Sequence, residues 1–232
     1  MSIPADSFEA IRAAIDTSYS RTVSILYPGL ADSTGYPARD GQRWQGLFRS
    51  SSGFEIRSFD ARVRAVEGGP SDPPGGPYSA RVLTTPFTTE TDDPRRPDFE
   101  ADLFFRRPGQ PFADGPVITL FSGYWALYKG QLEFTLNDEY YVFRFARGPE
   151  DKRGHREPML ALSTSFGLQH LPSAGIDNGL LWVGDLDRDG RLDLLADEGW
   201  NSTTSVPTLY LSGEARDGEV VRRVARTSVC DC

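Results

Sequence analysis

The chain has 232 residues, with 33 acidic and 25 basic side chains and a formal net charge of −8. This balance excludes the basic surface that a nucleic-acid-binding protein needs, so we expect no nucleic-acid partner. No apolar run approaches the ~18 residues of a membrane-spanning helix, so we expect no membrane span. Hydrophobic residues make up 38% of the chain, enough for a substantial core, while 23 glycines and 17 prolines favour turns over long helices.

One short amphipathic helix is predicted near the N-terminus, over residues 6–18. Asp6 and Glu9 form an acidic version of the capping box, and Ile11 and Ile15 share one face at helical spacing. No secretory apolar segment precedes this helix, so we expect that any export signal has already been removed from this sequence.

From residue 21 onward the hydrophobic period is two, which is typical of strands. Turn chemistry separates the strands, for example at Asn137-Asp138. A long Gly- and Pro-rich loop is expected over 67–77 and a polar, Pro-rich loop over 88–98. The predicted strands cover residues 21–27, 43–49, 54–66, 79–85, 99–105, 117–121, 124–128, 131–136, 139–145, 159–166, 180–183, 192–195, 208–212 and 220–224. We therefore predict a mainly β single domain spanning 1–232, an antiparallel β-sandwich or a partial propeller-like assembly.

A short acidic stretch carries the clearest chemical signal. Four aspartates stand at relative positions 1, 3, 5 and 9 of this stretch: Asp185, Asp187, Asp189 and Asp193. Without a counter-ion these carboxylates would repel one another. Calcium takes several oxygen ligands in a flexible shell, Gly190 at position 6 suits the sharp turn, and Arg191 at position 7 offers its carbonyl. The sequence predicts a calcium site, with a metal-free acidic turn as the alternative.

This loop resembles the calcium loop of the FG-GAP and VCBS repeats, which form the blades of integrin-type β-propellers. Their pattern, D-x-D-x-D-G-x-x-D, lies between two hydrophobic strands, as 185–193 lies here between Leu181-Trp182-Val183 and Leu194-Leu195. The resemblance covers residues 180–197 and implies that the four aspartates give side-chain oxygens and Arg191 its carbonyl. It is present once rather than once per blade, so it implies a single strand–loop–strand site and no complete propeller.

A looser resemblance concerns the stretch up to Val224. It is similar to a recurring tail of exported bacterial proteins of unknown role, in which a strand like Thr208–Ser212 and a Gly-Glu-Val-Val segment follow the aspartate loop. This resemblance implies a periplasmic or extracellular location. A calcium loop of the extracellular class binds its ion at about 0.1 to 1 mM, so the ion would be held where calcium is abundant. An EF-hand is excluded because Ala196 stands where its bidentate glutamate belongs.

Residues that could catalyse a reaction are sparse. The two histidines, His155 and His170, have no motif partner, and no G-x-S-x-G nucleophile turn is present. Glu133, Asp138 and Glu139 surround one predicted hairpin, and a pair of carboxylates can hydrolyse a glycosidic bond. Solvated surface carboxylates are the commoner explanation of such a group, so the sequence favours no catalytic residue.

These observations favour a calcium-binding, non-enzymatic module that acts outside the cytoplasm, with a structural ion and a protein or glycan ligand. The alternative is a calcium-stabilised hydrolase that acts on glycans or cell-envelope material. Cys230 and Cys232 form a C-terminal Cys-x-Cys pair. A disulfide between them would close a small strained ring, so two tail thiols are expected.

Overall fold

The computed structural model describes residues 22–26, 30–32, 37–67, 79–87, 101–126, 130–150, 156–172, 179–198, 204–227 and 229–230. The described residues form strands, turns and loops without a helix, which confirms the mainly β prediction. Within this part of the chain, no helix is long and apolar enough to cross a membrane. The predicted helix over 6–18, the side chain of Cys230 and the whole of Cys232 lie outside the described residues.

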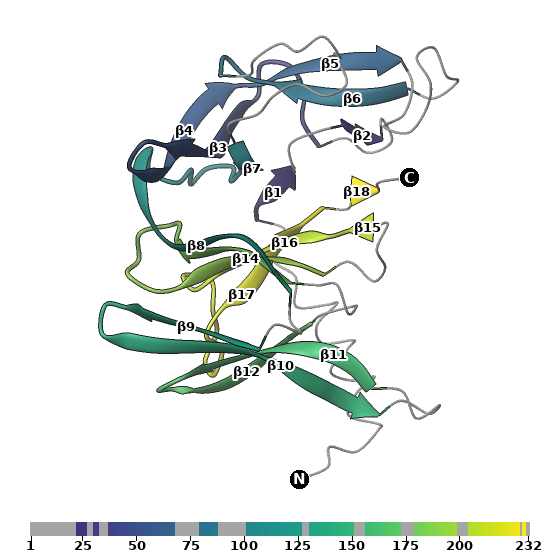
Figure 1. Cartoon of the computed structure of the whole chain (residues 1–232). Helices are drawn as coiled ribbons and strands as arrows, with labels where there is room; N and C mark the ends of the chain where they lie inside the picture. The colour runs from purple at the N-terminus through teal and green to yellow at the C-terminus, as the bar shows by residue number, and fades with distance from the viewer. Residues whose placement is uncertain are drawn as a thin grey trace. The chain divides into compact units, whose positions relative to one another are not determined.

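Two compact units divide the chain (Figure 1). Unit 1 comprises the described residues of Thr119–Ser228, and unit 2 those of Thr22–Ile118 and Val229–Cys232. Each unit has a cluster of buried apolar side chains of its own. The interpretation of the chain as a single domain therefore stays a prediction.

Strands make up most of both units. The strands of the described residues, in chain order, are β1 (Ser24–Leu26), β2 (Leu30–Asp32), β3 (Arg43–Ser50), β4 (Gly53–Asp60), β5 (Arg62–Glu67), β6 (Ser79–Thr84), β7 (Ala101–Arg106), β8 (Gly115–Ala126), β9 (Gln131–Leu136), β10 (Glu139–Glu150), β11 (Arg156–Thr164), β12 (Gly167–Pro172), β13 (Gly179–Asp185), β14 (Asp193–Asp197), β15 (Thr204–Ser205), β16 (Pro207–Leu211), β17 (Arg222–Arg226) and β18 (Val229–Cys230). Strand β8 begins in unit 2 and ends in unit 1.

Unit 2 is organised around the hairpin of β3 and β4, which pair antiparallel from Arg43 opposite Asp60 to Ser50 opposite Gly53. Its strands are hydrogen-bonded in the order β1-β7-β3-β4-β8, and a second sheet has the order β2-β6-β5. Aromatic side chains fill its core, where Phe48 meets Phe104 edge to face at 6.2 Å between ring centroids. Their large buried apolar area stabilises this unit.

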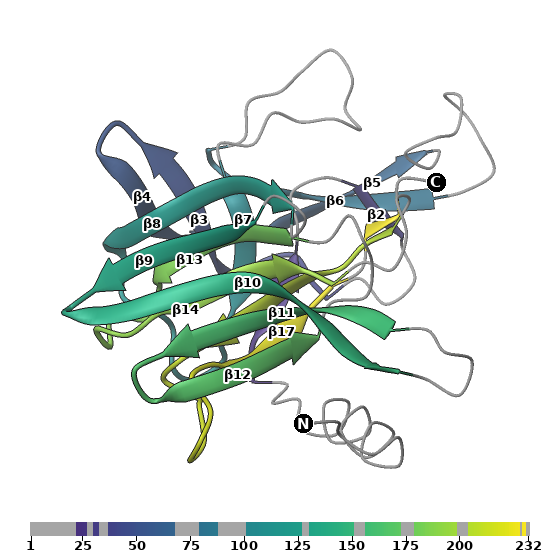
Figure 2. The same cartoon turned by 60° about the horizontal axis from the view of Figure 1, so that its bottom comes forward.

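Unit 1 contains two sheets that share one core. In one sheet β13, β14, β16 and β17 are neighbours in that order, and the other has the order β12-β11-β10-β9 (Figure 2). The core takes Leu180, Val183 and Leu194 from the first sheet and Phe143 and Leu162 from the second. Two sheets packed through one apolar layer are the arrangement of a β-sandwich, one of the two architectures that the sequence predicts for the chain.

Some predicted strands differ in extent from the observed ones. The strand predicted over 54–66 is two strands, β4 and β5, with a break at Ala61. There the backbone N–H and carbonyl bond the turn before β3 instead of a neighbouring strand. Strands predicted separately over 117–121 and 124–128 are one strand, β8, which passes Gly123 with a φ of 131°. Glycine tolerates this φ, so its presence does not end the strand.

Further differences concern strand positions. Strands β2, β12, β15 and β18 are absent from the predicted strands. Strand β11 ends at Thr164, and Phe166, predicted to end the strand, lies in the turn that follows. Strand β17 lies two residues later than the strand predicted over 220–224.

Two other segments of unit 1 lie at the acidic loop, the end of β16 and the turn between β9 and β10. Strands β13 and β14 pair antiparallel with Gly184 opposite Asp193, so residues 186–192 form the loop between them. Strand β14 also pairs antiparallel with β16, so the first residue of β14 lies beside the end of β16. The turn between β9 and β10 approaches the same loop through Asn137.

Candidate metal centre

The loop between β13 and β14 is anchored in the core at both ends. Leu186 and Leu192 are its first and last residues, and both side chains are buried. Between them the backbone turns sharply, with φ of 61° at Arg188 and 81° at Gly190. These left-handed values favour glycine, which agrees with the sharp turn predicted at Gly190.

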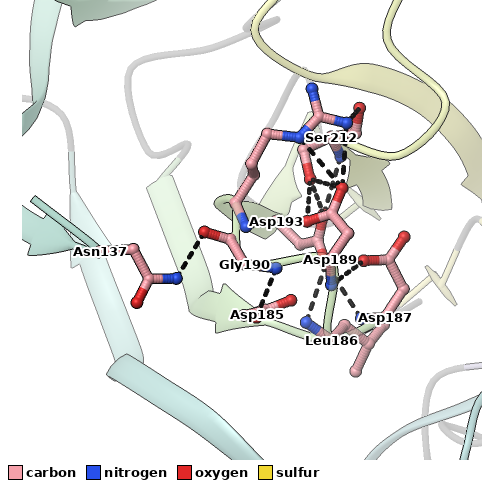
Figure 3. A network of polar contacts seen from close by, with 9 residues as sticks. Asn137, Asp185, Leu186, Asp187, Asp189, Gly190, Asp193 and Ser212 are labelled. Carbon is pink, nitrogen blue, oxygen red and sulfur yellow. Dashed lines mark hydrogen bonds and ion pairs between the residues drawn. The ribbon is translucent and has the colours of Figure 1, made fainter. Parts of the chain in front are cut away.

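Three of the four predicted aspartates converge. Asp185, Asp187 and Asp193 each offer a carboxylate oxygen, and these oxygens lie within 4.8 Å of one another (Figure 3). Asp185 is 4% exposed and Asp193 is fully buried. Two carboxylates that are removed from water and face a third strongly disfavour the fully charged state unless a cation or protons offset it.

One carboxylate oxygen of Asp185 is buried without a hydrogen-bond partner. Its Oδ2 accepts a hydrogen bond from the Gly190 N–H at 3.0 Å, whereas its buried Oδ1 has no hydrogen-bond partner. Burial raises the pKa of Asp185 above its ordinary value, and the negative charge of Asp189 adds to the rise. An orphaned buried acceptor costs about 1–3 kcal/mol, so Oδ1 needs a partner, and a cation at the convergence point would supply one.

Asp193 is held from two sides. Its Oδ2 accepts hydrogen bonds from the N–H groups of Leu186 at 2.8 Å and Asp187 at 3.3 Å. Its Oδ1 accepts bonds from the Ser212 N–H at 2.8 Å and from the Ser212 hydroxyl at 3.0 Å. Burial raises the pKa of Asp193 well above its ordinary value, and the carboxylate of Asp187 adds to the rise against the effect of these donors. The position of this carboxylate is therefore fixed, while its charge is unfavourable.

Asp189, the fourth predicted ligand, has a different environment. Its Oδ2 forms an ion pair with the guanidinium of Arg191, with Nη2 at 3.0 Å and Nε at 3.2 Å. The Arg191 N–H donates to Oδ1 at 2.8 Å, and the Ser212 hydroxyl lies 3.1 Å from both oxygens. A neighbouring side chain thus neutralises Asp189. The ligand role of the Arg191 carbonyl, which the resemblance implies, stays a prediction.

Sequence reasoning missed two residues that contact the loop. Ser212, directly after β16, binds Asp193 and Asp189 and accepts a hydrogen bond at its carbonyl from Arg191 at 3.1 Å. Asn137, in the turn between β9 and β10, donates to the carbonyl of Gly190. A signal for Ser212 was present, because the predicted strand over 208–212 ends at this residue, but the sequence did not show which strand lies beside it.

The candidate catalytic residues do not converge. Glu133 and Tyr140 lie on the face of the β9–β12 sheet that points away from the core, where the Tyr140 hydroxyl donates to the Glu133 carboxylate. Glu139 is on the opposite side of β10 and accepts hydrogen bonds from the Ser165 N–H and hydroxyl. His170 is exposed on β12. Asp138 is exposed in the turn and His155 lies outside the described residues. The described candidates Glu133, Asp138, Glu139 and His170 therefore do not come together as a pair of carboxylates or as a carboxylate with a histidine.

Comparisons with known proteins give no match: no family model, no curated protein and no solved structure matches the chain. What the site can bind is therefore inferred from the chemistry of its own side chains. Converging carboxylates with a buried unpaired oxygen form a hard, all-oxygen donor set. Such a donor set suits a divalent cation such as calcium.

Proposed function

We propose that this protein is a calcium-binding, non-enzymatic module that acts outside the cytoplasm. The unpaired, buried Oδ1 of Asp185, set among three converging carboxylates, is the observation that carries the proposal. Asp185, Asp187 and Asp193 hold the ion through their carboxylates. Asp189 and the carbonyl of Arg191 complete the ligand set that the resemblance implies.

Calcium fits this donor set better than a proton or magnesium does. Protonation could relieve the charge of one buried aspartate, but a single proton cannot bridge three carboxylates. Magnesium demands near-ideal octahedral geometry and usually keeps several waters, which suits a site built from buried protein oxygens poorly. Calcium accepts a flexible shell of protein oxygens and supplies the positive charge that the buried pair of Asp185 and Asp193 requires.

The ion has a structural role in this proposal. It ties the two ends of the β13–β14 loop together and so holds Leu186 and Leu192 in the core of unit 1. A loop of the extracellular class binds calcium at about 0.1 to 1 mM, and calcium reaches that concentration outside the cytoplasm. Because Glu133 and Glu139 lie on opposite faces of their sheet, these two residues do not form the carboxylate pair that the hydrolase alternative considered.

Calorimetry and thermal unfolding test the calcium site. After dialysis against a chelator, the wild type should bind calcium with a saturable heat and should bind magnesium more weakly. Calcium at a hundred times its Kd should stabilise the fold by about 2.7 kcal/mol if it binds only the folded chain. Asp187→Asn should lose both effects. Asp138→Asn should keep both, because it removes an exposed carboxylate from a neighbouring turn.

A wild type whose heat and melting temperature ignore millimolar calcium would overturn the proposal. The binding-module part needs a separate experiment, a screen of glycans and envelope proteins in calcium and in chelator. We expect calcium-dependent retention of a ligand without its turnover. Turnover of a glycan by the wild type would contradict the non-enzymatic assignment.

A further inference from the structure

The turn that follows β16 lies against three of the four aspartates of the candidate site. Ser212 is 1% exposed, and its hydroxyl oxygen lies 3.0 Å from Asp193 Oδ1 and 3.1 Å from both oxygens of Asp189, so its single proton is shared between the two carboxylates. Its N–H donates to Asp193 Oδ1 at 2.8 Å. Ser212 thus sets the positions of the Asp189 and Asp193 carboxylates, which belong to the β13–β14 hairpin.

Gly213, the next residue, leaves the space that Asp187 fills. A methyl group in the place of its α-hydrogen would sit 2.6 Å from Asp187 Oδ2 and 3.4 Å from Asp189 Oδ2. The first distance is shorter than real contacts of a Cβ atom, so any residue other than glycine would displace the Asp187 carboxylate. The backbone of Gly213 is not in the left-handed region, so an added side chain here would act by moving the Asp187 carboxylate and not by straining the backbone.

Antiparallel register explains why this turn lies at the loop. Leu194 is opposite Tyr210 and Leu195 is opposite Leu209, so the start of β14 lies beside the end of β16. Asp193 opens β14 and Ser212 directly follows β16. The pairing therefore places the two residues next to each other, although they are 19 positions apart in the chain.

We infer that Ser212 and Gly213 are part of the metal site, with Ser212 as a positioning residue for Asp193 and Gly213 as the surface against which Asp187 lies. The inference rests on the proposed calcium function and extends the site beyond the loop itself. Bound calcium then joins the β13–β14 loop to the turn between β16 and β17. Ion binding thereby orders a segment that contributes no carboxylate to the cluster.

Calcium titration of four variants tests this inference. Ser212→Ala should weaken calcium binding by about tenfold or more, which is typical when a group that orients a metal ligand is lost. Ser212→Thr keeps a hydroxyl and should restore most of the affinity. Gly213→Ala should weaken binding because its methyl group displaces Asp187. Ser205→Ala is the matched control, because it removes a 2.7 Å hydrogen bond from a serine hydroxyl to Asp197, outside the loop.

Hydrogen exchange of the amides in residues 213–218 provides a second measurement. Calcium should slow their exchange in the wild type and in Ser205→Ala, but not in Ser212→Ala. A Ser212→Ala protein with the wild-type Kd would overturn the inference and leave the calcium site intact. If Ser212→Ala does not fold, wild-type affinity in Gly213→Ala overturns it instead. A wild type that binds no calcium would remove the proposed function and this inference together.

Discussion

Asn137 Nδ2 lies 2.8 Å from the carbonyl oxygen of Gly190 and donates a hydrogen bond to it across 53 positions of the chain. Both residues have left-handed backbones, with φ of 48° at Asn137 and 81° at Gly190. A methyl group on Gly190 would sit 3.1 Å from Asn137 Nδ2, so the two residues fit closely. The turn of one hairpin thus supports the acidic loop of another.

Asn137→Gly is expected to lower the free energy of unfolding by about 1 kcal/mol, the usual net contribution of one hydrogen bond. Glycine keeps the left-handed backbone, so the change removes the amide donor without adding strain. Urea unfolding in the presence of a chelator measures the effect. Asp138→Gly is the control, since Asp138 has a similar φ of 65° in the same turn. Equal unfolding free energies for the two variants would show that the contact to Gly190 does not stabilise the fold.

Asp189→Asn should weaken calcium binding less than Asp187→Asn does. Asp189 is neutralised by the Arg191 guanidinium 3.0 Å away, and a second cation close to this guanidinium would be repelled. Asp187, by contrast, belongs to the converging carboxylates. Calorimetric titration of both variants in one buffer gives the comparison. Equal losses would make Asp189 a full ligand, as the FG-GAP pattern implies.

The fold was predictable where local signals agree. The hairpin of β9 and β10 combines clean alternation with Asn137-Asp138 at the turn, and its strands begin where they were predicted. Strand β12 was not predicted because, at its start, an apolar side chain faces solvent and a polar one faces the interior. Leu168 is 51% exposed, while Gln169 points inward, so the alternation does not reveal the buried face.

The site was predictable as far as its chemistry is local. Three of the four predicted aspartates converge, as their spacing indicated. The pairing of Asp189 with Arg191 was not evident, because an arginine two residues away has several possible partners. Ser212 could not be assigned to the site from the sequence, for another reason. Its place depends on which strand pairs with β14, and strand pairing is a property of the whole sheet.

Gln169 should be important for the stability of unit 1. Its Oε1 accepts hydrogen bonds from the N–H groups of Val220 at 2.7 Å and Val221 at 3.0 Å, and its Nε2 donates to the Val221 carbonyl at 2.7 Å. This side chain joins the β9–β12 sheet to the segment before β17. Gln169→Ala leaves these backbone groups without their partner and should lower the unfolding free energy by about 2 kcal/mol or more.

Gln169→Glu provides the matched comparison. It keeps an acceptor for both N–H groups, but at neutral pH it places a carboxylate oxygen against the Val221 carbonyl oxygen, where the amide Nε2 donates in the wild type. Its loss of stability relative to the wild type in urea unfolding should therefore be smaller at a pH low enough to protonate this glutamate, whose O–H can donate, than at neutral pH. Wild-type stability in Gln169→Ala would show that water replaces the side chain at these backbone groups at no cost.

The last prediction concerns a buried ion pair at the far end of β14. Glu198 and Arg223 are less than a tenth exposed, and Arg223 Nη2 lies 3.0 Å from Glu198 Oε2. The hydroxyl of Tyr210 also donates to Glu198. Burial raises the pKa of Glu198 above its ordinary value, although Arg223 and Tyr210 oppose the rise. The Glu198 carboxylate therefore binds a proton more tightly in the folded protein than in the unfolded chain.

The sign of the pH effect follows from this raised pKa. Where the folded state binds more protons than the unfolded state, stability falls as the pH rises. The contribution of Glu198 should therefore decrease between its ordinary pKa and its raised pKa, and stay constant above that. Glu198→Gln does not titrate, so the unfolding free energy of the wild type minus that of the variant should fall across this window.

Urea unfolding of both proteins from about pH 4 to pH 7 measures this difference. Titratable groups that the two proteins share contribute equally to both unfolding free energies, so their effect cancels in the difference. A difference that rises with pH would mean that Arg223 lowers the pKa of Glu198 more than burial raises it. The ion pair would then stabilise the charged form outright. A falling difference would instead mean that desolvation outweighs the pairing, and that the buried charges reduce the stability of unit 1 at neutral pH.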